Sequence, residues 1–401
     1  MQGLDPAARA VWYGRADGLL DWALRVYKFQ KRRLGGGIES SGLAGGLESA
    51  EAEQARYYLR LFTRAARTVE AVGGCGDLDG AGWGETSRIY LDPKEGSGAL
   101  REMLQAPPRE HKVLSLFPAK SVSASAGFFS PEKLYRLVAG YIVTNPVHGK
   151  AAARRWQEAQ REAGLDVTDD LLSALGDEYG FALVTFAQNM FSPGSFVLAW
   201  KAKGAAAAAK AIARLTGAVR AKPTSEGVSY LNITEEEYDG VGMRVLYLPF
   251  PLAGLNPTLG VVDGYLVLAS GKDTFQSVVE TAKKREKSIR EDGDFRRLAV
   301  RTAEKGTSIS FSRVADQVDN LASSLRSFSA LLALGALGEK PQTPEEEKER
   351  AELNETMSLL NDAARVVEAL KAYRVNASSC AYTGGCLEMK NYTEIEMKEG
   401  K

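Results

Sequence analysis

Four segments of the chain change from an alternating apolar and polar pattern directly into a helical pattern. Alternation is typical of a half-buried strand, and apolar residues every three or four positions are typical of an amphipathic helix. The segments are SVSASAGFFSPEKLYRLVAGY from Ser121, SFVLAWKAKGAAAAAKAIARL from Ser195, LGVVDGYLVLASGKDTFQSVVETAKK from Leu259 and SISFSRVADQVDNLASSLRS from Ser308. We therefore predict an α+β fold with mostly antiparallel curved sheets and helices packed on one face.

The strand pattern SVSASAG near Ser121 resembles SISFSRV near Ser308, and a helical pattern follows each of them. A repeated strand-and-helix unit is the pattern that an internal duplication leaves in a sequence. We therefore predict two related halves in the core.

The two ends of the chain differ from this central pattern. Apolar spacing predicts helices over residues 8–33 and 49–72, with the glycine-rich loop GGGIESSGLAGG between them. Residues 1–80 are thus predicted to be a helical extension, and residues 81–335 the α+β core. Residues 336–401 predict a long helix that begins at Thr343-Pro344, then two terminal strands that complete the core.

Three local features give sharper structural predictions. Gly176 follows a short leucine-rich run and predicts a helix end in the left-handed conformation. Asp263-Gly264 lies between two strand patterns and predicts a two-residue hairpin turn. The alanine-rich residues 204–216 predict a helix that packs closely against the strand at residues 196–200.

Composition excludes several classes of partner. The chain has 401 residues, of which 44% are apolar, enough for a substantial core. Lys+Arg and Asp+Glu number 51 each, so no net charge attracts nucleic acid or anionic lipid. No segment reaches the about 20 apolar residues of a membrane-spanning helix. We therefore predict no nucleic-acid partner and no transmembrane segment, and we make no prediction of the oligomeric state.

Few side chains offer catalytic chemistry. The only histidines, His111 and His148, lie near no obvious nucleophile and are predicted to be solvated loop residues. The one catalytic alternative is a group of carboxylates, Asp169, Asp170 and Glu178, that could act as general acid and base.

No metal or cofactor is predicted. Cysteine and histidine spacings do not suit zinc. The stretch DLDGAGWGE at Asp77 lacks the acidic residue that ends a calcium loop, and ASGKDT at Ala269 lacks the spacing of a phosphate loop.

The three cysteines are Cys75, Cys380 and Cys386. Cys380 and Cys386 flank AYTGG in the predicted terminal hairpin and could form a disulfide in an oxidising compartment. A two-residue turn at Gly384-Gly385 would place them out of direct register, so free thiols are the alternative.

Three stretches together resemble an uncharacterised bacterial family of cell-envelope proteins, a domain of unknown function. They are DLLSALGDEYGFAL from Asp170, FVLAWKAKGAAAAAKAIARL from Phe196, and YDGVGMRVLYLPF from Tyr238 together with LGVVDGYLVLASGKDTFQSVVETAKKREKSIREDGDFRRL from Leu259. The resemblance covers roughly residues 110–330. It implies an exported protein of the periplasm or cell envelope and supplies no catalytic residues. No export signal opens the chain, so a cytoplasmic location is the alternative.

Two functions compete. The first is a non-enzymatic cell-envelope protein that binds a protein partner or an apolar ligand between sheet and helices. The second is a hydrolase or transferase that uses Asp169, Asp170 and Glu178. An apolar cleft without converging carboxylates favours the first function, and two carboxylates within about 10 Å across a cleft favour the second.

Overall fold

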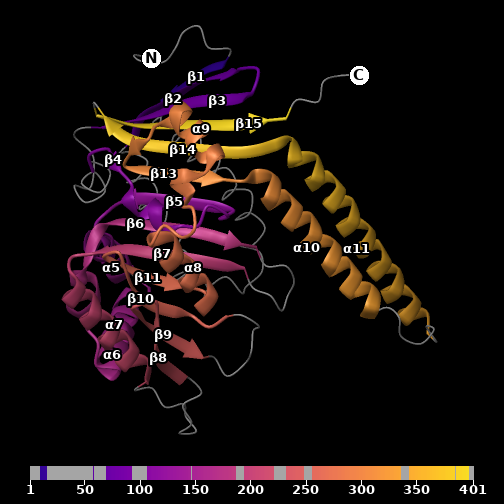
Figure 1. The fold of residues 1–401 in the computed structure, drawn as a ribbon. Helices are drawn as coiled ribbons and strands as arrows, with labels where there is room; N and C mark the ends of the chain where they lie inside the picture. Colours follow the sequence, from indigo (N-terminus) through magenta and orange to yellow (C-terminus); the bar gives the residue numbers. More distant parts are fainter. Residues whose placement is uncertain are drawn as a thin grey trace, which may run out of the picture.

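The computed structural model describes residues 10–15, 57, 69–92, 106–145, 147–186, 194–220, 232–247, 255–335, 343–383 and 385–396. Most of its strands join one antiparallel sheet of thirteen strands (Figure 1). In order across the sheet, they are β1 (Ala10–Arg15), β2 (Val69–Leu78), β3 (Gly82–Leu91), β15 (Cys386–Ile395), β14 (Tyr373–Thr383), β13 (Ser308–Ser312), β5 (Ser123–Phe128), β6 (Leu175–Thr185), β7 (Ser195–Ala202), β11 (Tyr265–Ala269), β10 (Thr258–Val262), β9 (Val241–Tyr247) and β8 (Asn232–Tyr238). Two short strands, β4 (Arg109–Glu110) and β12 (Lys305–Gly306), pair separately. The α+β prediction is thus confirmed.

The helices follow the strands much as the sequence pattern predicts. The longer ones are α5 (Pro131–Val143), α6 (Gly149–Ala163), α7 (Ala205–Arg220), α8 (Lys272–Ala282), α9 (Gly293–Thr302), α10 (Val314–Gly335) and α11 (Pro344–Ala369). Short helical turns are η1 (Lys112–Leu116), η2 (Val167–Leu171), η3 (Leu172–Ala174), η4 (Ile289–Glu291) and η5 (Leu370–Ala372). Each of the four predicted strand-to-helix segments is found: β5 leads to α5, β7 to α7, β11 to α8 and β13 to α10.

Helices cover both faces of the sheet, so the prediction of helices on one face is wrong. Neighbouring residues of a strand point to opposite faces. On β8, Glu236 forms an ion pair with Lys272 of α8 over 2.6 Å, while Glu235 pairs with Arg244, which also donates to Thr216 of α7. Helices α7 and α8 therefore lie on opposite faces. We call the face beneath α8 and α9 the helical face (Figure 1).

The main core fills the space between the helical face and the helices η1, α8, η4 and α9. Its largest fully buried apolar side chains are Phe117, Phe275, Phe311, Leu116, Ile289 and Leu298. The sheet leaves room for them at glycines: a Cβ at Gly260 would lie 2.6 Å from the Phe275 ring. Small residues in these strands therefore set how closely the helices approach the sheet.

The prediction of helix near the N-terminus is wrong at the described strands β1 and β2, whereas Tyr57, inside the predicted helix 49–72, is helical. Residues 10–15 form β1 instead of part of a helix, and Val69–Leu78 form β2. A Cβ at Gly74 would lie 2.6 Å from the indole of Trp12, so the aromatic side chain of β1 occupies the space above a glycine of β2. This long-range pairing overrides the local helical spacing. The other predicted helical positions fall largely outside the described residues.

Two predicted turns have opposite outcomes. Asp263 and Gly264 have φ values of 47° and 75° and join β10 to β11, so that hairpin prediction is confirmed. Gly176 lies inside β6 and does not end a helix in the left-handed conformation. The chain there makes only two short turns, η2, which Asp166 caps, and η3, and it is already extended at Leu175.

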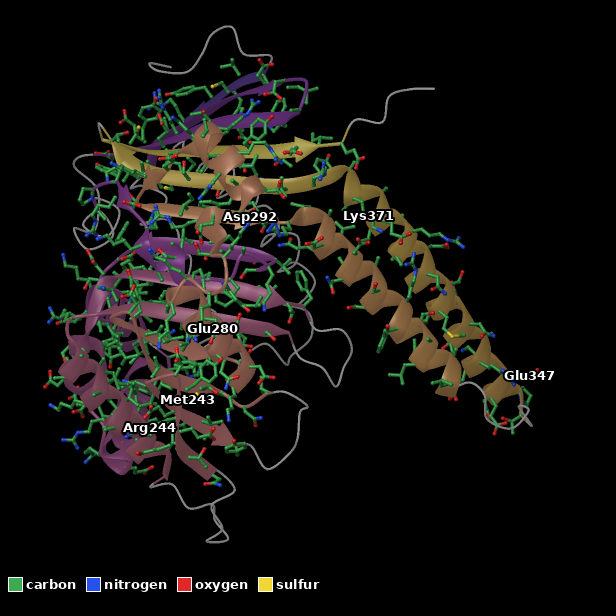
Figure 2. The ribbon with its side chains drawn as sticks, in the orientation of Figure 1. Met243, Arg244, Glu280, Asp292, Glu347 and Lys371 are labelled. Atoms are coloured by element: carbon green, nitrogen blue, oxygen red, sulfur yellow. The ribbon has the colours of Figure 1, made fainter. Side chains whose placement is uncertain are left out.

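Helices α10 and α11 extend together away from the sheet (Figure 1). The predicted start of α11 is confirmed, because the Thr343 hydroxyl accepts a hydrogen bond from the Glu346 amide over 3.2 Å. Figure 2 shows Lys371 at the base of this helical hairpin and Glu347 near its far end. Within the described part of the chain, no helix combines the length and apolarity needed to cross a membrane.

The alanine-rich helix α7 packs through only part of its alanines. Ala208 and Ala211 are buried, and Ile212 beside them is 8% exposed. Ala206 and Ala209 are exposed. The predicted close packing thus holds along one face of the helix, with the spacing of three and four residues that one helical face requires.

Leucine at Ala208 is expected to lower the free energy of unfolding by about 1–3 kcal/mol, because extra methylenes at a well-packed site displace their neighbours. The same change at exposed Ala209 is the control, with an expected effect below about 0.5 kcal/mol. Urea melts of both variants measure the difference. Equal losses at the two positions would show that this face of α7 is not packed as described.

Candidate functional site

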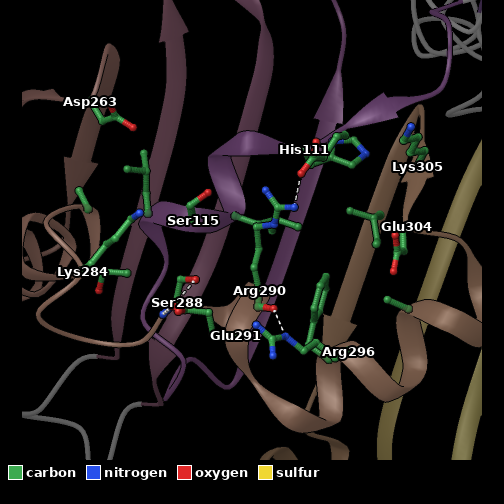
Figure 3. A pocket seen from close by; sticks show the side chains of 18 of the residues that line it. His111, Ser115, Asp263, Lys284, Ser288, Arg290, Glu291, Arg296, Glu304 and Lys305 are labelled. Atoms are coloured by element: carbon green, nitrogen blue, oxygen red, sulfur yellow. Dashed lines mark hydrogen bonds and ion pairs between the residues drawn. The ribbon is translucent and has the colours of Figure 1, made fainter.

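A pocket of about 790 Å³ opens on the helical face between η1, η4, α9 and the β10–β11 turn (Figure 3). Its buried apolar lining consists of Leu114, Leu116, Phe295, Ala299 and Ile309, and half-buried Ala282 and exposed Val300 complete the apolar part. Its charged lining lies at the surface and includes both acidic and basic side chains: Glu110, Asp263, Lys284, Arg290, Glu291, Arg296, Glu304 and Lys305. The volume falls in the range of small-molecule sites. We call it the His111 pocket, after the buried histidine in its lining.

The two short helical turns that frame the pocket are fixed by backbone hydrogen bonds to each other. The Ile289 amide donates to the Phe117 carbonyl over 2.8 Å, and the Ala119 amide donates to the Lys287 carbonyl over 2.8 Å. In η4, Glu291 and Ser288 form a capping box, which orders the turn at its start. The pocket is therefore held open by ordered backbone.

A buried glutamate attaches η1 to the sheet. Glu178 on β6 is 7% exposed and accepts hydrogen bonds from the Val113 amide over 2.9 Å and from the Tyr265 hydroxyl over 2.7 Å. Burial, and then the neighbouring Glu178, raise the pKa of Tyr265. The Tyr265 hydroxyl thus stays protonated and keeps donating to Glu178.

His111 is buried, so its prediction as a solvated loop residue is wrong. It is 2% exposed, and its ring stacks on Phe128 with centroids 4.6 Å apart. Neither ring nitrogen makes a hydrogen bond of good geometry to any described residue. The pKa of His111 is lowered to about 4, chiefly by burial; the Gly306 backbone opposes this shift, and the charges of Arg109 and Arg290 add to it.

The imidazole is therefore neutral at pH 7, with one nitrogen as a donor and the other as an acceptor. Buried polar atoms are normally paired, and an unpaired one costs about 1–3 kcal/mol. His148, the other histidine, is exposed, as the sequence predicts.

Some charged residues at the mouth of the pocket already have partners, as Arg296 does by donating to the Arg290 carbonyl over 2.9 Å. Glu110 forms an ion pair with Arg290, which lowers the pKa of Glu110. Hydrogen bonds from the Ser288 backbone and side chain lower the pKa of Glu291. Four others form no ion pair with any described residue and remain available to a ligand: Asp263, Lys284, Glu304 and Lys305.

The carboxylates proposed as a catalytic group do not line this pocket. Glu178 lies beneath η1 as described above. Asp170 accepts from the Asp166 amide over 2.9 Å and lies 3.4 Å from Arg214 of α7. Asp169 lies beside it in η2, and its carbonyl accepts from Ser173. Asp170 and Glu178 thus each have a structural contact that explains their presence.

The possible disulfide between Cys380 and Cys386 is not formed, and all three cysteines are free thiols. In the β14–β15 register, Cys380 lies opposite Met389 and Cys386 lies opposite Thr383. Cys380 is three residues from the position opposite Cys386, about 10 Å along the strand, which exceeds the about 7 Å limit for a bridge. Among the described residues, no cluster of three or more His, Cys, Asp or Glu side chains could hold a metal ion.

Comparisons with protein-family models, with curated proteins and with solved structures found no match to this chain. The resemblance to a cell-envelope family thus remains a prediction from the sequence. The pocket geometry is the main basis for assigning a function.

The sequence pattern does not reveal the site. The segment PPREHKVLSLFP has no clear strand or helix period, and the pocket forms from segments far apart in the chain. The one local signal is a histidine directly before the apolar run VLSLF, which η1 buries almost entirely.

Replacing Glu178 with alanine is expected to cost about 3 kcal/mol of stability or more, because it leaves the Val113 amide and the Tyr265 hydroxyl without their acceptor. The double variant Glu178→Ala/Tyr265→Phe is expected to recover part of this loss, because it also removes the Tyr265 hydroxyl, one of the two donors left without an acceptor. Denaturant melts of the single and double variants test this. Unchanged stability in Glu178→Ala would contradict the structural role of Glu178.

Stability is expected to fall as the pH drops from about 6.5 to about 4. In that window the unfolded chain binds a proton at residue 111 that the folded protein excludes, because the folded pKa is about 4 and the ordinary value is 6.5. The expected loss is on the order of 2 kcal/mol.

His111→Phe is expected to remove this part of the pH dependence and to keep or raise stability at pH 7, because it deletes two buried nitrogens that lack hydrogen bonds of good geometry. Exposed His148→Asn is the matched control and is expected to leave the slope unchanged. Melts across pH 4–8 give the comparison. A slope that is the same in wild type and His111→Phe would contradict the depressed pKa.

Proposed function

We propose that the protein is a non-enzymatic binding protein of the bacterial cell envelope, and that the His111 pocket holds an apolar ligand with a polar end. The observation that carries this proposal is the pocket itself: a largely buried apolar lining with charged side chains of both signs at its mouth. A ligand whose apolar part fills this lining would gain apolar burial.

The arrangement of charge supports a ligand that lies with its apolar part inside. The buried lining offers aliphatic and aromatic side chains, whereas Lys284, Lys305, Asp263 and Glu304 are exposed at the mouth. A polar headgroup at the mouth would stay hydrated and could pair with one of these charges.

The alternative function is a carboxylate-dependent hydrolase or transferase that uses Asp169, Asp170 and Glu178. It has less support, because none of the three lines the His111 pocket, and both Asp170 and Glu178 already have partners. The location in the periplasm or cell envelope rests on the sequence resemblance, with the cytoplasm as the alternative.

The element order supports a proposal of two related halves in a curved sheet. The chain segment β5-α5-α6-β6-β7 runs strand, two helices, two strands, and β13-α10-α11-β14-β15 runs the same way. The two units meet where β5 pairs with β13, and their remaining strands continue outward on either side. A duplicated unit would account for this order.

Binding can be tested with a fluorescently labelled long-chain fatty acid and its methyl ester. Ser115→Trp places a large ring in the pocket lining and is expected to weaken binding of either probe at least about tenfold. The control is Ser323→Trp on the exposed surface of α10, which is expected to leave binding unchanged.

Native mass spectrometry of the purified protein provides an independent measurement, since a retained ligand would appear as added mass that Ser115→Trp removes. If neither probe binds and no ligand is retained, the pocket does not have this function. If the protein turns over a substrate and Glu178→Gln abolishes that turnover without lowering stability, the hydrolase or transferase alternative replaces the binding proposal.

A further inference from the structure

One apolar seam joins α10 to α11. Its residues recur at intervals of four and three on both helices, the spacing that lets antiparallel helices pack knobs into holes. They are Val318, Ala322, Leu325, Ser329 and Leu332 on α10, and Leu353, Met357, Leu360, Ala364 and Val367 on α11. Ser329 donates to the Met357 carbonyl over 3.4 Å and accepts from Asn361 over 3.1 Å, which places the two helices in contact across this seam.

A second apolar stripe lies beside this seam and is exposed. Its residues also follow heptad spacing, and their exposed fractions range from 47% to 69%. They are Leu321, Phe328 and Leu331 on α10, with Leu359, Val366 and Leu370 on or just after α11. We call these six residues the outer stripe.

Both halves of the outer stripe lie on the same side of the hairpin. At about 100° per residue, the stripe is displaced from the seam by roughly 100° on α10, and by a similar angle in the same sense on α11. For two antiparallel helices that face each other, equal displacements in the same sense point to one side of the pair. The stripe therefore forms a single apolar surface two helices wide.

The size of this surface suits a protein interface. The six side chains expose on the order of 600 Å², at the upper limit of the largest apolar patches on typical monomers. A standard interface takes about 800 Å² from each partner, and the flanking small residues Ser324 and Ala363 would add to the area. Small flanking side chains also allow a second pair of helices to approach closely.

The charges on the hairpin disfavour an anionic lipid surface as the occupant. The first turn of α11 carries Glu345, Glu346 and Glu347, whereas helices that bind anionic membranes carry Lys and Arg around their apolar face. At the base, Lys371 and Arg326 already pair with Asp319 and Glu368. The heptad spacing instead matches another helical seam, and a second copy of this chain presents the same spacing.

We propose that the outer stripe packs against the outer stripe of a second copy, so that two hairpins form a four-helix bundle about a two-fold axis. A two-fold interface uses the same surface on both partners, as this self-matching spacing allows. The partner is thus an identical chain, and the sheet with its His111 pocket lies outside the interface. This proposal does not depend on what the pocket binds.

Sedimentation velocity of the full chain, across a hundredfold range of concentration into the micromolar range, tests the proposal. The wild type is expected to sediment as a dimer. Val366→Glu places a charge in the outer stripe of each copy and is expected to raise the dimer dissociation constant at least about tenfold. Val143→Glu on α5, where the valine is 51% exposed, is the matched control and is expected to remain dimeric.

Circular dichroism melts establish that each variant is folded, and Val366→Ser replaces Val366→Glu if the charged variant is not. A wild type that is monomeric at every concentration overturns the proposal. So does a dimer that Val366→Glu and Leu359→Glu leave intact. Co-flotation of a monomeric wild type with phosphatidylglycerol or phosphatidylcholine vesicles, abolished by Val366→Glu, would assign the stripe to lipid and likewise overturn it.

Discussion

The attachment of η1 to β6 determines whether the His111 pocket exists. Gly180 is the central contact: a Cβ there would lie 2.8 Å from both the Phe117 ring and the Val113 side chain, so only glycine lets η1 lie this close to the strand. Two residues earlier, Glu178 accepts from the Val113 amide and holds the start of the turn. Burying a carboxyl group is costly unless its hydrogen bonds are made. Glu178 accepts hydrogen bonds from both the Val113 amide and the Tyr265 hydroxyl. It therefore holds η1 in one defined position and fixes His111, which directly precedes η1.

The two faces of the sheet are built for different purposes. On the helical face, β5 and β13 contribute Ala124, Ala126, Ile309 and Phe311 to the core. On the other face, the same strands and β14 present serines and asparagines that bond to one another, as Ser310 does with Ser378 over 2.7 Å. These side chains are only partly buried. A strict alternation of apolar and small polar residues thus gives the centre of a very wide sheet one face for packing and one that can stay hydrated.

Sequence reasoning succeeded where a local signal decides the structure. The alternation in SISFSRV and the Asp263-Gly264 turn each act within a few residues, and the strands and turn lie where they were predicted. It failed where a distant partner decides. β1 forms because Trp12 lies over Gly74, and the burial of His111 depends on Phe128 and on the attachment of η1. The register of the terminal hairpin also follows from a local signal, since the turn predicted Cys380 and Cys386 to lie out of direct register, as they do.

Arg313 connects the pocket to the helical hairpin. It follows β13, whose Ile309 lines the pocket, and it stands directly before α10. Its guanidinium donates to the Ala119 carbonyl over 2.8 Å and to Asp292, the cap of α9, over 2.8 Å, with only 16% of the side chain exposed. An arginine with two such acceptors holds a fixed geometry. The base of α10 is thus fixed to the segment that follows η1 and to the start of α9, so the hairpin leaves the sheet in a direction that the walls of the pocket help to set.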